Sequence, residues 1–364
     1  MKFGRKQIML SLILFIVILI VCLLLLRTFF TGLIRQKVKV TASNGIDSIE
    51  YVEINGIQQA IHIKGNDQKN PILLFLHGGP GFTEMPVSYR YQKEWEDHFI
   101  VVQWDQRSAG KTYVANRDIA PANNDGIKLR VNDCIQLSEF LLARFQKEKL
   151  VLTGHSWGSV LGICTIKEKP ELFSTFIGIG QLVNLADSEV LGYQQTVSLA
   201  EQANNEKDLH TLQKLLPYPN QNQQASYTPE FAKKMMSLRK LQGEYEIGMP
   251  ASYIENFRYF VCSPYYSLRD LSYYLTDVFS QNYALYQWLY EDFDLRQIDL
   301  QFEIPMIFIY GQNDWTTPYS LFEEEVFDRI QSPKKELHIL DHAAHRPMND
   351  NPSAFLEILK KIHD

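Results

Sequence analysis

Hydrophobic residues form several short continuous runs along the chain and one long run near its N-terminus. The short runs predict strands buried on both faces of a parallel sheet, because half-exposed strands alternate apolar and polar residues instead. They cover residues 71–76, 98–104, 150–153, 173–179, 305–310 and 336–340. Ahead of them, residues 48–54 and 57–63 flank Asn55-Gly56, a pair typical of a tight turn, and predict a β-hairpin.

Apolar residues at helical spacing occur between several of these runs. They extend across residues 131–145 and again after Asn351, where Pro352 suits the first position of a helix. The alternation of strand and helix predicts an α/β fold with a doubly wound, mostly parallel sheet. Residues 182–299 break this rhythm, with helical stretches and no clear strand run. We interpret them as a helical cap inserted between two core segments, residues 48–181 and 300–364.

The long apolar run occupies residues 8–26 and contains no charged residue. A helix needs about 20 apolar residues to cross the hydrocarbon core of a bilayer. A core helix would carry a polar face, and a cleaved signal peptide usually has a shorter apolar region followed by a small-residue cleavage site. We therefore expect residues 1–35 to form an uncleaved transmembrane anchor and residues 36–47 to form a polar linker.

Basic residues flank the apolar run on both sides in nearly equal number, so the charge count only weakly favours one orientation of the anchor. Lys2, Arg5 and Lys6 precede the run, and further Lys and Arg residues follow it between positions 27 and 39. Positive charge near the ends of a span favours the cytoplasmic side. The short N-terminal tail has the denser charge, which favours a cytoplasmic tail and an extracytoplasmic remainder.

Charge and cysteine content exclude some classes of partner. The formal net charge is −6 and the pI is about 5.9, and no basic stripe is present, so we expect no nucleic-acid partner. Cys22 lies in the apolar run, and Cys134, Cys164 and Cys262 do not have metal-ligand spacing. We expect buried thiols rather than a disulfide framework or a metal site.

A candidate nucleophile follows the run at residues 150–153. Gly154-His155-Ser156-Trp157-Gly158 fits the G-x-S-x-G pattern, which a chain of this length matches by chance roughly one time in ten. The context strengthens the match, because a strand precedes it and a helical pattern follows at residues 157–166. The glycines allow a tight turn that presents Ser156. The alternative is a glycine-rich turn with an incidental serine.

A second glycine-rich loop, His77-Gly78-Gly79-Pro80-Gly81, follows the run at residues 71–76. In enzymes with such a serine turn, the corresponding loop donates a backbone N–H to the oxyanion hole. We expect this donor to be Gly79, with Gly78 as the alternative, because proline has no N–H. The second donor is the N–H of Trp157. The alternative interpretation is an ordinary Gly/Pro turn.

The acid and the base should follow the serine in the chain. Asp314 comes after the run at residues 305–310, which places a carboxylate at the carboxyl edge of the sheet, where ligands bind in such folds. His342 and His345 both come after the last strand run, and periodicity alone does not choose between them.

Three segments together resemble the proline iminopeptidase group of α/β-hydrolases. They are the loop at residues 77–81, Trp104-Asp105-Gln106-Arg107 and the serine motif at residues 154–158, within a resemblance that covers roughly residue 49 to the C-terminus. The resemblance implies the α/β-hydrolase fold. Residues 344–347, running on to residues 350–352, are similar to the family's terminal pattern, which implies that His345 is the base. The family usually has glycine where Ala344 stands.

The resemblance extends more weakly into the cap. Residues 255–260 resemble a family segment in which a glutamate holds the free amine of the substrate, although one residue is extra here. This similarity implies that Glu255 binds substrate. Glu244 and Glu246 lie nearby in the sequence and add to an acidic cap.

The candidate residues predict covalent acyl transfer. Ser156 attacks a carbonyl, His345 accepts its proton, Asp314 orients the imidazole, and water releases the acid, with no metal or organic cofactor required. We expect a membrane-bound aminopeptidase that acts on short peptides. An esterase or amidase for small molecules is the second hypothesis, and a non-catalytic binding protein is the third.

Overall fold

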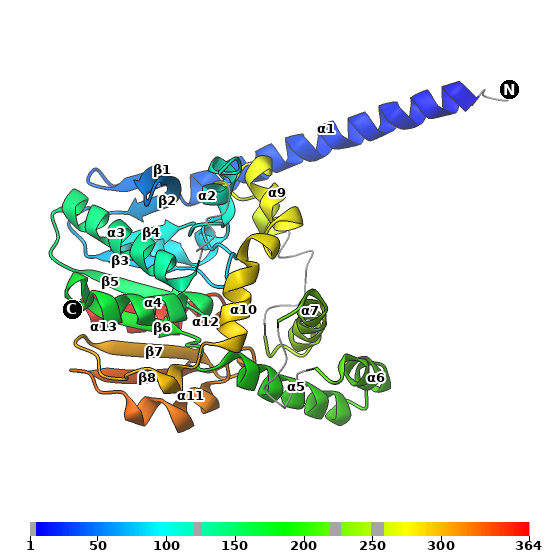
Figure 1. The fold of residues 1–364 in the computed structure, drawn as a ribbon. Helices are drawn as coiled ribbons and strands as arrows, with labels where there is room; N and C mark the ends of the chain where they lie inside the picture. The colour runs from blue at the N-terminus through cyan, green and yellow to red at the C-terminus, as the bar shows by residue number, and fades with distance from the viewer. Residues whose placement is uncertain (1–4, 120–125, 219–226, 249–257, 364) are drawn as a thin grey trace.

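The structure is a computed structural model that describes residues 5–119, 126–218, 227–248 and 258–363. Its centre is an eight-stranded sheet with the order β1-β2-β4-β3-β5-β6-β7-β8 (Figure 1). β2 runs antiparallel to β1 and β4, and the other neighbours are parallel. The strands are β1 (Ile46–Ile54), β2 (Ile57–Gly65), β3 (Ile72–Leu76), β4 (Ile100–Trp104), β5 (Leu150–His155), β6 (Phe173–Ile179), β7 (Met306–Gly311) and β8 (Lys335–Leu340).

The predicted doubly wound, mostly parallel sheet is confirmed. Each of the six apolar runs overlaps one strand, and the hairpin turns at Asn55-Gly56 as expected. Every residue of β3, β4 and β5 is buried, which explains why these strands lack alternation in the sequence.

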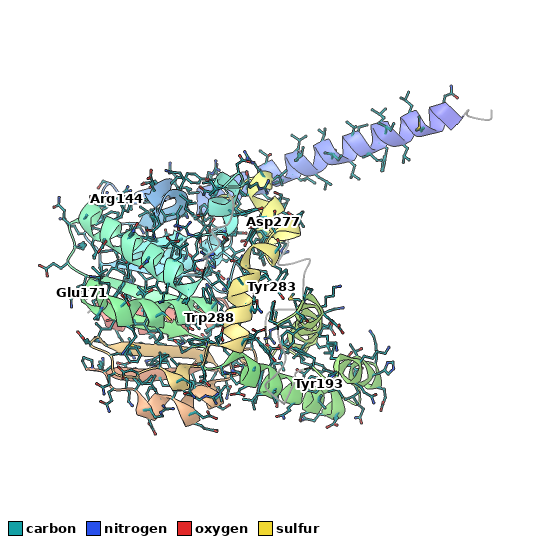
Figure 2. The ribbon with its side chains drawn as sticks, in the orientation of Figure 1. Arg144, Glu171, Tyr193, Asp277, Tyr283 and Trp288 are labelled. Carbon is teal, nitrogen blue, oxygen red and sulfur yellow. The ribbon has the colours of Figure 1, made fainter. Side chains whose placement is uncertain are left out.

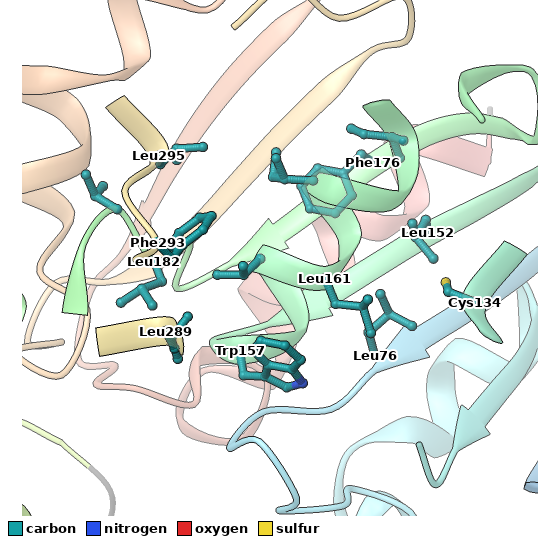
Figure 3. Close-up of a cluster of buried hydrophobic side chains, with 14 of the residues drawn as sticks. Leu76, Cys134, Leu152, Trp157, Leu161, Phe176, Leu182, Leu289, Phe293 and Leu295 are labelled. Atoms are coloured by element: carbon teal, nitrogen blue, oxygen red, sulfur yellow. The ribbon is translucent and has the colours of Figure 1, made fainter. Parts of the chain in front are cut away.

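Helices cover both faces of the sheet. One face holds the larger apolar core, formed with α3 (Ile127–Phe145), α4 (Trp157–Glu168) and α11 (Tyr319–Glu325). The other face packs against α13 (Pro352–His363) and the 3-10 helix η2 (Gln92–Asp97). Figure 3 shows the larger core running from Leu76 and Leu152 of the sheet to Phe293 and Leu295. Short elements complete these layers: η1 (Ser88–Arg90), α2 (Gly110–Ala115), η3 (Pro170–Leu172), η6 (Phe327–Arg329) and α12 (Pro347–Asp350).

The cysteines have different environments. Cys134 lies in this core and is fully buried, which raises the pKa of its thiol to about 12. Cys164 and Cys262 are half-buried, whereas Cys22 is exposed, and all four thiols are free.

The segment between β6 and β7 is helical where the structure describes it. Its two ends pair beside the sheet, since Asn184 forms a β-bridge with Asp294 and the N–H of Leu295 donates to the carbonyl of Val183 at 2.8 Å. α10 carries Tyr283 and Trp288 between the sheet and α7 (Figure 2). The elements are α5 (Leu185–Gln202), α6 (Glu206–Leu215), α7 (Pro229–Glu244), α9 (Leu268–Thr276), η4 (Ser280–Asn282), α10 (Tyr283–Glu291) and η5 (Leu295–Gln297).

The N-terminal segment is a single long helix, α1 (Arg5–Lys37), that projects away from the rest of the molecule (Figure 1). The most apolar 18-residue window within Met9–Lys37 has a mean hydropathy of 3.5, and none of that window is buried. Side chains radiate freely from it in Figure 2. α1 is therefore long and apolar enough to cross a membrane, and it is not a core helix. The expected boundary at residue 35 falls inside α1, and β1 begins at Ile46.

Candidate active site

Ser156 occupies a sharp turn between β5 and α4. Its backbone has φ 54° and ψ −117°, a conformation that non-glycine residues rarely adopt. The N–H of Ser156 donates to the carbonyl of Ile179, the last residue of β6, at 2.9 Å. Ser156 remains partly exposed, whereas His155 and Trp157 on either side of it are buried. The turn thus presents the Ser156 side chain at the carboxyl edge of the sheet.

The two motif glycines are required by close backbone approaches. A Cβ at Gly154 would lie 2.2 Å from the carbonyl oxygen of Gly158, and a Cβ at Gly158 would lie 2.1 Å from that of Leu76. Neither contact is possible, because backbone atoms cannot move aside as a flexible side chain can. The pattern seen in the sequence therefore reflects the packing of α4 against β3 and β5.

The glycine loop (residues 77–83) lies against this turn. A Cβ at Gly78 would come within 3.3 Å of the Ser156 Cβ. Gly79 has φ +116°, in the region that favours glycine. Within the described residues, the N–H groups of Gly79 and Trp157 donate to no protein acceptor. Both are therefore available to an oxygen of a bound substrate.

Gln106 links the two sides of this candidate oxyanion hole. Its backbone N–H donates to His77 Nε2 at 3.3 Å, and its side-chain amide donates to the His77 carbonyl at 3.2 Å. Its Oε1 accepts the indole N–H of Trp157 at 3.0 Å. Burial lowers the pKa of His77 to about 4, so the ring is neutral, with Nδ1–H donating to the Gly78 carbonyl at 2.8 Å. This explains one part of the Trp104-Asp105-Gln106-Arg107 motif.

Asp314 lies in the loop after β7 and is 1% exposed. Its Oδ1 accepts the backbone N–H groups of Thr316 and Thr317, at 2.9 and 3.0 Å. Its Oδ2 accepts the Thr317 hydroxyl at 2.8 Å and contacts His345 Nδ1 at 2.9 Å. The local turn therefore fixes the carboxylate so that one oxygen faces the histidine.

His345 lies in the loop after β8 and is 4% exposed, whereas His342 is exposed to solvent. The His345 ring contacts Asp314, and the His345 backbone carbonyl accepts a hydrogen bond from His155 Nε2 at 2.7 Å. The rings of His155 and His345 are 4.8 Å apart. A Cβ at Gly180, directly after β6, would lie 3.6 Å from His345 Cε1. His345 and Ser156 therefore both border the end of β6, and of the two candidate histidines only His345 reaches Asp314.

The three cap glutamates are not placed at the serine turn by the described structure. Glu255 lies outside the described residues. Glu244 and Glu246 are exposed, and Glu244 pairs with Lys240 at 3.8 Å. Within the described cap, the Trp288 ring of α10 lies 6.4 Å from the ring of Trp157, which directly follows Ser156.

Three supporting residues had no sequence signal of their own. Gln106 stands inside a recognised motif, but nothing local indicates which groups it joins. Thr317 and His155 act through contacts made across loops, with Asp314 and His345 respectively. In the part of the chain that the structure describes, no group of three or more His, Cys, Asp or Glu side chains is arranged to hold a metal ion.

Comparison with known proteins gives a family and a relative that each span most of the chain. The sequence pattern of the α/β hydrolase fold family matches residues 71–352. A probable aminopeptidase, YbaC of Bacillus subtilis (strain 168), is 30% identical over 322 residues, which cover 88% of this chain and 98% of that protein.

Two solved structures share the fold. A proline iminopeptidase-related protein from Thermus thermophilus has a TM-score of 0.55 and 20% identity, covering 87% of this chain and 97% of its own. A membrane phospholipase A, described as a bacterial virulence factor, has a TM-score of 0.54 and 16% identity, covering 98% of both chains. The family pattern and the aminopeptidase relative each span most of the sequence, and the chain belongs to the α/β-hydrolase fold family.

Proposed function

We propose that the protein is a serine hydrolase whose triad is Ser156, His345 and Asp314. The observation that carries the proposal is the pairing of a strained, partly exposed serine turn with a buried His345–Asp314 contact of 2.9 Å at the same edge of the sheet. A non-catalytic binding protein has no need for a serine in a costly backbone conformation.

The mechanism follows from these contacts. With Nδ1–H donating to Asp314, the free Nε2 of His345 accepts the proton of Ser156 as its Oγ attacks a carbonyl carbon. The oxyanion that forms accepts the N–H groups of Gly79 and Trp157. The imidazolium, stabilised by Asp314, then protonates the leaving group. Water attacks the acyl-enzyme with His345 as base and regenerates Ser156.

We propose an aminopeptidase acting on short peptides as the leading activity. The 30% identical relative is named a probable aminopeptidase, and Glu255 stands in the segment that resembles an amine-binding stretch. An esterase or amidase for small molecules is the second candidate. It is favoured by aromatic side chains beside the glycine loop, where the partly exposed Phe82 packs edge-on against Phe279 at 5.6 Å and can receive an apolar acyl group.

A pair of matched substrates separates the two activities. An aminopeptidase is expected to lose about 100-fold in kcat/KM when an aminoacyl amide is N-acetylated, because the carboxylate of Glu255 loses its ammonium partner. Glu255→Gln is expected to remove most of this difference. Glu246→Gln is the control, since this exposed cap glutamate should leave both rates unchanged.

Equal rates on the two substrates in the wild type would refute the aminopeptidase and favour the esterase. A fluorophosphonate probe that fails to label the wild-type protein would contradict both hydrolase proposals and favour a binding protein.

We also propose that α1 anchors the enzyme in a membrane, with the N-terminal tail in the cytoplasm and the catalytic domain outside. The support is the exposed apolar surface of α1, which water would solvate poorly and a bilayer would cover.

The full-length protein is expected to sediment with membranes and to resist carbonate extraction. Its intact mass should retain residues 1–35, since an anchor is not removed as a signal peptide is. Introducing arginine at Leu14 and Leu19, near the middle of the apolar run, should release it, because each charge costs about 3 kcal/mol at the centre of a span. A mature protein that begins beyond residue 26 would show that the segment is a signal peptide.

A further inference from the structure

The last turns of α1 have one face that contacts the rest of the protein. Arg27, Thr31 and Ile34 are half-buried and Val38 is 5% exposed, at helical spacing, whereas the residues between them are exposed. Described positions before Arg27 are exposed all round the helix. We name residues 27–38, the last turns of α1 and the residue that follows it, the docked end of α1.

The docked end donates hydrogen bonds to one short stretch of backbone, the docking segment (residues 261–266). Arg27 Nε donates to the Val261 carbonyl at 2.9 Å, and Arg27 Nη2 donates to the Tyr266 carbonyl at 2.8 Å. Two further hydrogen bonds follow along the same face. Thr31 Oγ1 donates to the Cys262 carbonyl at 3.2 Å, and Arg35 Nη2 donates to the Pro264 carbonyl at 3.2 Å. Carbonyl groups outside regular structure need such donors when they are shielded from water. Figure 1 shows this end of α1 beside α9, which follows the segment.

The docked end is also fixed to the sheet domain. The buried Lys64 ammonium donates to the Val38 carbonyl at 2.6 Å and pairs with Glu96 at 3.3 Å. Lys93 Nζ donates to the Lys37 carbonyl at 2.5 Å. The helix therefore joins the docking segment to β2 and η2, so that the segment has a fixed position.

The docking segment reaches the glycine loop through tyrosine hydroxyls. The buried Tyr266 hydroxyl lies 2.9 Å from Thr83 Oγ1 and also donates to Asp105. In α9, the fully buried Tyr273 donates to the Gly81 carbonyl at 3.1 Å. The loop that carries Gly79 is thus held at its far end by Tyr266, whose backbone carbonyl accepts a hydrogen bond from Arg27, and by Tyr273 of the helix that follows.

We propose that the docked end of α1 is a positioning element of the active site, and that Arg27 is its principal positioning residue. Arg27 fixes the backbone of Tyr266, Tyr266 fixes Thr83, and the glycine loop keeps the Gly79 N–H aimed at the developing oxyanion. This proposal rests on the proposed hydrolase function. It assigns to residues beside the apolar span a role in the chemistry of a site that they do not touch.

The test compares Arg27→Gln with Thr28→Val in full-length protein in detergent. Thr28 is exposed and bonds only to the Leu24 carbonyl of its own helix, so Thr28→Val should behave as wild type. Removing an oxyanion donor outright costs about 10²- to 10³-fold in kcat, and a displaced donor less. Arg27→Gln is therefore expected to lower kcat and the rate of fluorophosphonate labelling about tenfold, with KM within about twofold of wild type.

A double-mutant cycle separates positioning from general destabilisation. Tyr266→Phe should also lower kcat, and adding Arg27→Gln to it should cause little further loss, because both variants interrupt the same chain of contacts, from Arg27 through Tyr266 to Thr83. Independent, multiplicative losses would overturn the proposal, as would wild-type kinetics in Arg27→Gln. If Arg27→Gln does not fold, Thr31→Val combined with Arg35→Gln tests the same face, and an unchanged kcat in that variant overturns the proposal. A wild-type protein that is not labelled would instead refute the hydrolase function.

Discussion

Replacing Ser156 with alanine is expected to lower kcat about 10⁴- to 10⁶-fold, down to the residual activity that the oxyanion hole alone supports. Without the hydroxyl no acyl-enzyme forms, so labelling by a fluorophosphonate probe should disappear as well. The fold should be retained, because alanine keeps the Cβ and the Ser156 N–H still donates to Ile179. Turnover, labelling and the melting temperature of the purified variant check these expectations.

Ser138 offers a matched control for this experiment. It is buried in the hydrolase core, and its hydroxyl donates to the Cys134 carbonyl one turn earlier in α3. Ser138→Ala should keep near-normal turnover. Normal turnover in Ser156→Ala would instead show that another residue is the nucleophile.

His345→Ala is expected to cause a loss of similar size, roughly 10⁴-fold or more in kcat, because no other described imidazole contacts Asp314. His342→Ala, three residues earlier in the same loop, should change kcat little, since its side chain is exposed. Comparing the two variants on the same substrate checks the assignment. The opposite pattern, with His342→Ala inactive, would transfer the role of base to His342.

The centre of the sheet was predictable because strands such as β3 and β4 are buried on both faces, which forces continuous apolar runs. The serine turn was predictable for a related reason. Gly154 and Gly158 have no room for a Cβ, so the local geometry leaves a mark in the sequence. Gly158 is constrained by Leu76 of a neighbouring strand, but the motif itself spans only five residues and can be recognised without knowing the tertiary structure.

Contacts between distant segments left no comparable mark. The spacing of His342 and His345 is compatible with either as base, and only the position of Asp314, 31 residues before His345, distinguishes them. Arg27 stands in the sequence as one of several basic residues that flank an apolar span. Its acceptors are backbone carbonyls 234 and 239 residues further along the chain, and any residue type supplies that group. Sequence patterns carry no information about such partners.

The continuity of α1 has a consequence for how the enzyme meets its substrates. The helix passes from its apolar part into its docked end without a break, so there is no swivel between them. If the apolar part is held in a bilayer, the catalytic domain cannot rotate independently of the membrane, as a domain on a flexible linker can. A protein anchored in this way would diffuse in two dimensions at a set height and tilt, and its candidate active site would sample a thin layer of space near the membrane rather than the bulk solution.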